Sequence, residues 1–390
     1  MRLLLHIFDW VLYILFAINV LYLLIYSLAS LWSKTSMSTL ARRYKRFVLL
    51  IAAYKEDNVV MDTVQACLAQ DYPSDKYDVV VISDHMQPST NEKLRVLPIK
   101  LFVVDFEEST NTKSLKAALE YLGKDSYDIA LVIDADNIIN SSYLVDLNNA
   151  FADSEVKVVQ THRVAKNLNT NMAYLDAISE EINNSIFRLG HVNLGMSAAL
   201  IGSGMAFDYT LFYKAMMSNM SVGGFDRILE MELLFHRVFF YYLPDTYIFD
   251  EKIQKTKAFY QQRRRWLSAQ YYSLEEFVHY MLSAIRDRKW DFCDKLFQQA
   301  ALSRVLLLGF TFIFSLYLSI CFPALASKWW VMFGVLVFAI VVAIPRRFWK
   351  WRLVKSIFFI PYLFLLMFIN LFRLKEANKK FIHTEHGVDK

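Results

Sequence analysis

The sequence predicts an α/β domain with a mostly parallel mixed sheet, flanked by transmembrane and interfacial helices. Short apolar runs alternate with helical patterns in the first part of the chain, and long uncharged runs lie near both ends. Alternating strands and helices are typical of a largely parallel sheet. Hydrophobic residues make up 55% of the 390 residues, above the usual share of about 45–50%. The excess is concentrated at the two ends, which indicates membrane segments.

The expected elements follow one another in a regular order. Apolar residues at helical spacing mark the helices, and Gly123 is a helix stop. In chain order the elements are strand 47–53, helix 58–70, strands 78–84 and 100–105, helix 112–123, strand 128–136 and further strands within 199–207 and 242–249.

Acidic residues stand where the expected strands end. Asp84, Asp105, Asp134 and Asp136 all lie at carboxyl ends of strands. In open α/β sheets, ligands bind beyond the carboxyl ends of the strands. The sequence therefore predicts a polar site along one edge of the sheet.

An uncharged run near the N-terminus is long enough to cross a bilayer. As a helix, residues 10–32 would be about 34 Å long, and the hydrocarbon core is about 30 Å thick. A cleaved signal peptide is the alternative, but its apolar core has only about 7–15 residues. Basic residues follow the run, which predicts that the N-terminus lies outside and the middle of the chain in the cytoplasm. These residues are Lys34, Arg42, Arg43, Lys45 and Arg46.

Three apolar runs lie in the C-terminal part of the chain. We expect 302–323 and 329–345 to span the membrane. The run 356–372 is basic on both flanks, which favours a re-entrant or interfacial helix, whereas its apolarity favours a span. We expect the re-entrant or interfacial arrangement. Before these runs, residues 258–300 mix aromatic and basic residues in a helical pattern, as interfacial helices do.

Composition excludes several other classes of protein. Cys67, Cys293 and Cys321 form no disulfide framework, which fits a reducing compartment. The net charge of +5 is clustered near the membrane segments, so we expect anionic lipid as a partner and no nucleic acid. The sequence has no Gly-rich phosphate loop, which argues against an ATPase, and no polar pathway through many spans, which argues against a transporter.

The motif Asp134-Ala135-Asp136 follows the fourth apolar strand. Two carboxylates there suit a hard divalent cation, and Mg²⁺ is often held by one or two carboxylates together with substrate phosphates. Two solvated acids in a turn are the alternative, because a lone Asp-x-Asp is a weak signal. Its position after the fourth strand, with Asp84 ending an earlier strand, favours a site for Mg²⁺ or Mn²⁺.

Two further motifs add groups that bind phosphate or sugar. In QRRRW (262–266), three arginines offer paired donors to phosphate oxygens, and Trp266 offers a flat face to a sugar ring. A basic helix on the membrane surface is the alternative. In IGSG (201–204), two glycines permit close approach of the backbone to a ligand, and a simple turn is equally consistent with them.

Together these motifs resemble those of membrane-bound family 2 glycosyltransferases, a group that includes cellulose, chitin and hyaluronan synthases. The resemblance covers nearly the whole chain and implies a GT-A fold. AAYKED (52–57) resembles the motif whose aromatic residue and acid, here Tyr54 and Glu56, hold the uracil end of the donor. ISDH (82–85) resembles the motif whose aspartate, here Asp84, contacts the nucleotide. The remaining matches are Lys113 near the donor phosphates, Asp134 and Asp136 at the metal, and Gln262, Arg265 and Trp266 of the Gln-x-x-Arg-Trp motif.

The sequence departs from the family pattern at the catalytic base. The family usually has a Glu-Asp pair whose Asp is the base, and this chain has RILEMELLFH (227–236). Aligned on Leu233, Glu230 takes the place of that Asp, and Glu232 lies about 200° round a helix from it. The resemblance then implies one inverting displacement, with Glu230 as base. Arg264 and Arg265 would stabilise the leaving diphosphate, and Trp266 would stack on the acceptor.

The resemblance also implies a division of the chain. The expected parts are a transmembrane helix at 1–34, a GT-A domain at 45–257, interfacial helices carrying QRRRW at 258–300, membrane segments at 301–372 and a cytoplasmic tail at 373–390. The tail contains His383 and His386, which are not expected to bind metal. Similar tails in the family lie near the nucleotide site, so the tail is expected to close over the donor.

The expected function is transfer of a sugar, from a UDP-sugar donor, at the cytoplasmic face of an inner or plasma membrane. The acceptor is either a growing glycan or a lipid-linked molecule. The arginine–tryptophan motif favours processive synthesis, whereas three or four membrane segments favour partner subunits or a single addition. A non-catalytic scaffold is the alternative class, supported only by the departure at the Glu-Asp pair.

Overall fold

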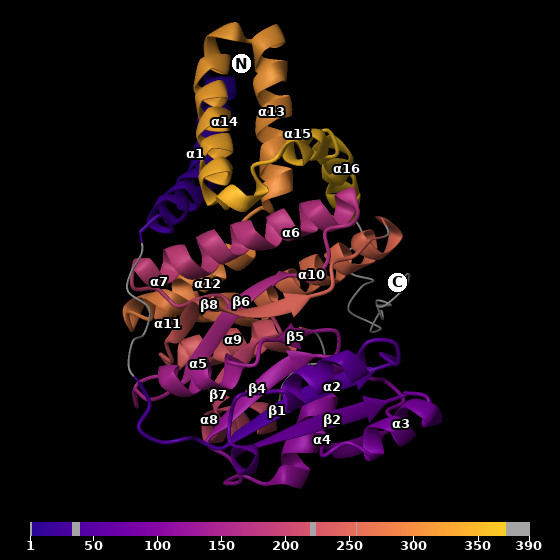
Figure 1. Cartoon of the computed structure of the whole chain (residues 1–390). Helices are drawn as coiled ribbons and strands as arrows, with labels where there is room; N and C mark the ends of the chain where they lie inside the picture. The colour runs from indigo at the N-terminus through magenta and orange to yellow at the C-terminus, as the bar shows by residue number, and fades with distance from the viewer. Residues whose placement is uncertain (1, 33–39, 219–223, 255, 372–390) are drawn as a thin grey trace. The chain divides into compact units, whose positions relative to one another are not determined.

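The computed structural model describes residues 2–32, 40–218, 224–254 and 256–371 (Figure 1). The chain forms two compact units. Among the described residues, the helical unit consists of 2–32, 178–195 and 300–371, and the sheet unit consists of 40–177, 196–218, 224–254 and 256–299, with Ile178–Gly195 falling in the helical unit. The helical unit therefore includes a stretch, Ile178–Gly195, from inside the segment expected to form the GT-A domain.

A mixed sheet of eight strands organises the described part of the sheet unit, in the order β3-β2-β1-β4-β7-β6-β8-β5. β1 pairs in parallel with β2 and β4, β2 with β3, and β6 with β8, while β7 and β5 are antiparallel to their neighbours. This confirms the predicted mostly parallel mixed sheet. The strands are β1 Phe47–Tyr54, β2 Tyr77–Asp84, β3 Lys100–Val104, β4 Ile129–Asp134, β5 Ile138–Ile139, β6 Val158–Ala165, β7 Met205–Asp208 and β8 Phe240–Asp250.

Two strands are shorter than the sequence suggests. β4 ends at Asp134, because the Asn137 N–H donates to the Asp134 carbonyl over 3.1 Å and closes a turn. Within 199–207, only the last residues join a strand, β7. Gly202 and Gly204 have φ of +89° and +65°, which turns the chain before β7 begins.

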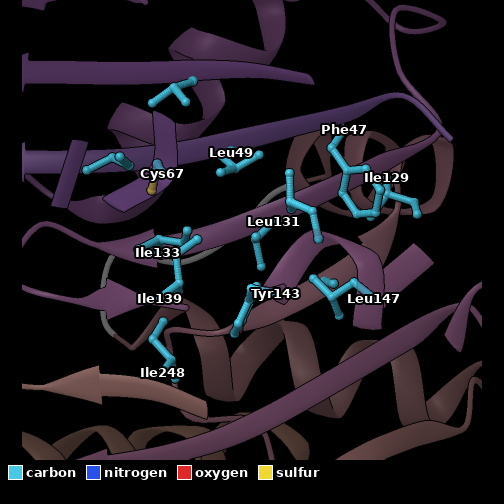
Figure 2. Close-up of a cluster of buried hydrophobic side chains, with 14 of the residues drawn as sticks. Phe47, Leu49, Cys67, Ile129, Leu131, Ile133, Ile139, Tyr143, Leu147 and Ile248 are labelled. Carbon is cyan, nitrogen blue, oxygen red and sulfur yellow. The ribbon is translucent and has the colours of Figure 1, made fainter. Parts of the chain in front are cut away.

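The core of the sheet unit lies against the central strands. Phe47, Leu49 and Ile51 of β1 are fully buried in one cluster, which Figure 2 shows together with Cys67 and Tyr143 from neighbouring helices. Burial on both faces explains why the strands are continuous apolar runs rather than alternating ones. Burial also raises the pKa of the Cys67 thiol, so this residue packs as a small apolar side chain.

Helices cover the sheet and lead into the site. α4 begins after Thr110, whose hydroxyl accepts from the Lys113 N–H, and it ends at Gly123 with φ of +80°, as predicted. The helices of the sheet unit are α2 Val60–Leu68, α3 Pro88–Arg95, α4 Asn111–Leu122, α5 Tyr143–Ala150, α8 Tyr209–Met217, α9 Phe225–Phe235, α10 Thr256–Phe277, α11 Met281–Arg286 and α12 Trp290–Ala300, with short turns η1 Ser74–Lys76 and η3 Val278–Tyr280. α6, Asn171–Asn183, belongs partly to each unit.

The helical unit contains three described helices long and apolar enough to cross a membrane: His6–Ala29 of α1, α13 and α14. α15 and α16 meet at a bend of 46° and would add a fourth span only if they act as one. α14 starts at Pro323, earlier than the predicted run, because the proline begins the helix directly after α13. The elements are α1 Arg2–Ala29, η2 Asn184–Gly190, α7 His191–Asn193, α13 Arg304–Cys321, α14 Pro323–Ala343, η4 Arg346–Phe348, α15 Trp351–Ile357 and α16 Ile360–Leu371.

Polar contacts tie the apolar helices of this unit together. Asp9 of α1 pairs with Lys328 of α14 and accepts from the indole N–H of Trp329 over 2.9 Å. The Ser27 hydroxyl donates to the Ala339 carbonyl over 2.6 Å. Buried polar groups that find partners across helices fix which faces of the helices meet.

Candidate active site

The acidic edge of the sheet forms as the sequence predicts. In the parallel register, Tyr54 of β1 pairs with Asp84 of β2, and Ala52 of β1 pairs with Asp134 of β4. The carboxyl ends of three neighbouring strands therefore present Tyr54, Asp84 and Asp134 on the same edge. Parallel pairing, which only the folded sheet establishes, gathers residues that are far apart in the sequence.

Asp84 is poised to receive a hydrogen bond from a ligand. Its side chain is 1% exposed, and Oδ1 lies 2.6 Å from Nδ1 of His85. Oδ2 is buried and has no hydrogen-bond partner among the described residues. His85 is held from its other side by Asp105, with 2.9 Å between Nε2 and Oδ1, and its ring lies edge-on to Tyr54. A buried carboxylate oxygen without a donor is costly, so a ligand N–H would be favoured there.

The backbone is strained directly after two of these strands. Lys55 follows β1 with φ of +55°, and His85 follows β2 with φ of +54°. Non-glycine residues rarely adopt this left-handed region, and such strain is concentrated at functional sites. Just beyond, the Glu56 N–H lies 3.1 Å from the Met86 sulfur, so the two strand ends are linked next to the predicted nucleotide residues.

The turn that carries Asp134 and Asp136 is clasped by Ser203 and Asn137. The Ser203 hydroxyl accepts from the Asp134 N–H over 3.0 Å and donates to Asn137 Oδ1 over 2.5 Å. Asn137, fully buried, donates through Nδ2 to Asp136 Oδ1 over 2.9 Å. The positive φ of Gly202 and Gly204 aims Ser203 at this turn, so the glycines serve the turn and, through it, the acids.

Asp136 is nearly buried, at 4% exposure, and its carboxylate is oriented from two sides. Besides Asn137, the N–H of Glu251 lies 3.3 Å from Oδ2. Asp250 stands beside this group and pairs with Lys252 over 2.6 Å. Asn137 Nδ2 also lies 3.4 Å from Asp250 Oδ1, so one amide contacts both carboxylates. Sequence reasoning missed Asn137 and Asp250, because their link depends on β8 returning to the end of β4.

The donor set fits a hard divalent cation. Asp134 and Asp136 supply carboxylate oxygens, the ligand type that Mg²⁺ and Mn²⁺ prefer. The hydrogen bonds from Asn137 and from the Glu251 N–H fix the orientation of Asp136, as hydrogen bonds to metal-binding carboxylates usually do. Asp84, His85 and Asp105 form a second cluster with metal-ligand spacing, although Asp105 is 87% exposed.

Lys113 stands in the first turn of α4, which follows the carboxyl end of β3. Its ammonium group donates to the Glu108 carbonyl over 2.6 Å, and its N–H donates to the Thr110 hydroxyl. This places a cation at a helix N-terminus, where backbone N–H groups also favour anions.

Arg265 of α10 faces the acidic edge. Burial lowers the pKa of its guanidinium, and the nearby carboxylates of Asp134 and Asp226 oppose that shift. Gln262, Arg265 and Trp266 lie on one face of α10, since residues three and four apart are neighbours on a helix. The structure therefore brings the arginine of QRRRW to the first acid of the metal motif.

The other residues of QRRRW lie on α10 around Arg265. Arg263 pairs with Asp176 and lies over the rings of Trp266 and Phe259, at 4.5 and 4.8 Å from the ring centres. Arg263 therefore orients Trp266, a role that the sequence did not suggest. Arg264 and Trp266 are half-buried, and Gln262 Oε1 is buried without a hydrogen-bond partner among the described residues.

Asp226 belongs to the site, although the sequence analysis did not select it. It stands in the first turn of α9, two residues after Gly224, whose φ is +65°. Its carboxylate lies beside Gly202 and close enough to Arg265 to influence it. Because the Glu-Asp pattern of the family was aligned on Leu233, the sequence indicated Glu230 as the base and not Asp226. The available signal was an acid directly after Gly223-Gly224-Phe225, at the start of a helix.

Glu230, the predicted base, lies in a buried ion pair instead. It is 1% exposed, with 2.7 Å between Oε1 and the Lys295 ammonium of α12. The same oxygen accepts from the Leu200 N–H over 2.8 Å. Burial lowers the pKa of Lys295, and Glu230 opposes that shift. These contacts describe a structural link between α9, α12 and the segment before β7, which does not suit a base that must meet an acceptor.

Acids at the carboxyl ends of parallel strands, with an arginine near them, form a polar site where open α/β sheets bind ligands. The sequence profile described as "Glycosyltransferase like family 2" matches residues 45–269, more than half of the chain. The chain therefore belongs to this glycosyltransferase family. The matched region extends through QRRRW. The predicted tail residues His383 and His386 lie outside the described residues.

Known proteins resemble the chain in sequence or fold. A beta-monoglucosyldiacylglycerol synthase from Synechocystis sp. is 24% identical over 238 residues, covering 58% of this chain and 48% of that protein, so the alignment spans about half of that relative. Mannosyltransferase PcManGT from Pyrobaculum calidifontis, solved with GDP-Man and Mn²⁺, has a TM-score of 0.53 at 17% identity and covers 84% of this chain and 96% of its own. This likeness shows a GT-A-like fold. S. aureus TarS 1-349 gives a TM-score of 0.44 at 15% identity, covering 88% and 97%.

Proposed function

We propose that this family 2 glycosyltransferase moves a sugar from a UDP-sugar to a lipid-linked or glycan acceptor, with inversion at the anomeric carbon. The observation that carries the proposal is that Asp134, at the carboxyl end of β4, and Asp226 lie near enough to Arg265 for their charges to oppose the lowering of its pKa by burial. In the proposed reaction, these three residues would serve as a metal ligand, a base and a phosphate-binding cation.

Asp226 is the proposed general base, in place of Glu230. Asp226 is half-buried beside Gly202, where an acceptor hydroxyl has room to approach because glycine has no side chain. Glu230 is enclosed by Lys295 and the Leu200 N–H. In the proposed step, the acceptor oxygen bonds to the anomeric carbon, its proton passes to Asp226, and the bond from that carbon to the diphosphate oxygen breaks. General-base catalysis of this kind contributes about 10²–10⁴-fold.

The donor is proposed to lie along the edge from β2 to β4. Asp84 would accept an N–H of the nucleobase, with Tyr54 and Glu56 beside it. Lys113, Arg264 and Arg265 would contact the diphosphate, and Arg265 would stabilise the charge that develops on it. Trp266 would stack on the acceptor.

Asp136 and Asp134 would hold Mg²⁺ or Mn²⁺ together with the diphosphate. When bound, the cation would supply charge stabilisation to the leaving group. The contribution of the chain is to fix Asp136 through Asn137 and the Glu251 N–H before the donor arrives.

The reaction is proposed to take place at the cytoplasmic face of a membrane. Three apolar helices long enough to span support insertion, and the basic residues after α1 support this orientation. α11 and the start of α12 expose Leu282, Ile285 and Trp290 beside basic residues, which supports an interfacial position. The Synechocystis relative, a beta-monoglucosyldiacylglycerol synthase, supports a lipid acceptor and a single addition over processive synthesis.

The test is nucleotide release by the full chain in purified membranes. A panel of UDP- and GDP-sugars is offered with Mn²⁺ or Mg²⁺, beside Asp136→Asn, Asp226→Asn and Glu230→Gln. We expect metal-dependent release of one nucleotide, lost in the first two variants and kept in folded Glu230→Gln. The anomeric configuration of the product, read by NMR, must be opposite to that of the donor.

Three outcomes would contradict parts of the proposal. Loss of release in folded Glu230→Gln, with release kept in Asp226→Asn, would return the role of base to Glu230. Retention of the anomeric configuration would exclude a single displacement. Donor binding without release, for every acceptor lipid offered, would favour the scaffold alternative.

A further inference from the structure

The helical unit contains a cavity of about 520 Å³ that the proposed sugar transfer does not use. It lies where α1, η2 and the segment after α14 come together. Its walls include apolar side chains, among them Leu31, Val341 and Ile344, and polar ones, Ser30, Ser185 and Arg346. A cavity of mixed polarity suits an amphiphile better than it suits either water or a purely apolar ligand.

The cavity lies at the ends of two candidate spans, which would be the level of the lipid headgroups when those helices cross a bilayer. The candidate span of α1 ends at Ala29, directly before Ser30, and that of α14 ends at Ala343, between the lining residues. The cavity therefore lies at the ends of two spans. It is also the end at which basic residues gather, in η4 and α15, and basic residues attract anionic lipid.

Hydrogen bonds between separate chain segments hold the walls in place. The Ser185 hydroxyl of η2 donates to the Ala343 carbonyl over 2.8 Å. The Trp349 indole N–H donates to the Ile344 carbonyl over 3.2 Å. Because these bonds fix the end of α14 against η2 and the following turn, the cavity is part of the fold.

Two adjacent arginines differ in what they contact. Arg347 pairs with Glu181, a buried carboxylate of α6. Arg346 lines the cavity, is exposed, and forms no ion pair with any described residue. The guanidinium of Arg346 is thus the cation available to an occupant, and paired N–H donors of this group match phosphate oxygens.

We infer that this cavity binds one anionic phospholipid, with its phosphate on Arg346 and an acyl chain along Val341, Ile344 and Leu31. Trp349 lies beside the proposed phosphate, at the interface level where tryptophan is favoured. The inference rests on the proposed membrane insertion and is independent of the sugar-transfer chemistry. The site would make the enzyme sensitive to the anionic lipid content of its membrane.

The experiment measures lipid retained by the full chain. The protein is purified in mild detergent from membranes containing phosphatidylcholine and phosphatidylglycerol, and bound lipid is identified by native mass spectrometry. We expect about one phosphatidylglycerol per chain, and at least about a tenfold loss of retention in Arg346→Ala, since a charge-assisted hydrogen bond is removed. Val342→Trp, which fills the cavity, should also lose the lipid. Lys350→Ala, in the same basic segment but not lining the cavity, should retain it.

Several results would overturn the inference. Equal retention by Arg346→Ala and the wild type would show that Arg346 does not hold the lipid. Equal loss in Lys350→Ala would indicate a general basic surface rather than a cavity. Preferential retention of phosphatidylcholine would exclude an anionic site. Thermal unfolding of each variant is recorded beside these data, and if Val342→Trp does not fold, Arg346→Ala and Lys350→Ala decide the matter.

Discussion

Asp226 and Glu230 lie one turn apart on α9, yet they have opposite environments. They are about 40° apart around the helix, so both face the segment that leads into β7. Asp226 lies beside Gly202 and within reach of Arg265, and it is half-buried. Glu230 lies beside Leu200 and Lys295 and is almost fully buried.

Two acids on nearly the same face of a helix therefore have different neighbours because they lie at different positions along it. At the start of α9, the carboxylate lies beside Gly202, which has no side chain to cover it. One turn further, α12 brings a lysine that closes the space. A buried ion pair of this kind is costly to form and more costly to break from one side, so we expect Glu230 to contribute to stability.

Replacing Asp226 should have the largest effect. We expect Asp226→Asn to lower kcat by about 10²–10⁴-fold, because the acceptor proton would have no base, while donor affinity stays close to wild type. Steady-state kinetics and donor binding by calorimetry would measure this. An unchanged kcat would mean that Asp226 is not the base.

Replacing Glu230 should affect stability instead. Glu230→Ala would leave the Lys295 ammonium buried without its carboxylate, which should cost about 3–5 kcal/mol of unfolding free energy. Thermal or denaturant unfolding of the full chain would measure the loss. The double variant Glu230→Leu with Lys295→Met should recover most of that loss. Failure to recover would mean that Glu230 acts through something other than this pair.

Replacing Asn137 tests whether its hydrogen bond to Asp136 serves metal binding. Asn137→Ala should weaken Mn²⁺ binding in the presence of nucleotide by about 10–100-fold, because it frees Asp136 to rotate. Electron paramagnetic resonance of free Mn²⁺ would measure this without turnover. Nucleotide binding without metal should not change.

Asn148 provides a matched control for this substitution. Asn148, in α5, is also buried, and it bonds to the Lys45 N–H and the Arg43 carbonyl just before the amino end of β1. Asn148→Ala should reduce stability but not Mn²⁺ affinity. Equal effects of both variants on Mn²⁺ binding would mean that the hydrogen bond from Asn137 to Asp136 has no specific role in metal binding.

Glu232, the third acid of α9, should show the smallest effect. It is half-buried, and its carboxylate accepts from the Ser218 hydroxyl over 3.2 Å. Glu232→Gln should change unfolding free energy by no more than about 0.5–1.5 kcal/mol and leave kcat unchanged. A loss of turnover here would mean that the acids of α9 have been assigned in the wrong order.

Local sequence patterns were enough to predict the edge and the motifs that lie on it. Buried strands are continuous apolar runs, so the acids that end them, Asp84 and Asp134, are visible without a structure. The spacing of Gln262, Arg265 and Trp266 likewise fixes one helix face. These features depend on neighbours within a few residues, and for that reason a sequence reveals them.

Only the tertiary structure decided which acids meet which cations. The choice between Asp226 and Glu230 depends on Lys295, Arg265 and Gly202, which come from three other segments of the chain. The hydrogen bonds that hold Asp136 depend on Glu251, which directly follows β8, and on the turn that Gly202 and Gly204 make with positive φ. Charge, burial and hydrogen bonding act through space, so local patterns predict the fold class and the acidic edge, and only packing brings Asp226 near Arg265 and Glu230 to Lys295.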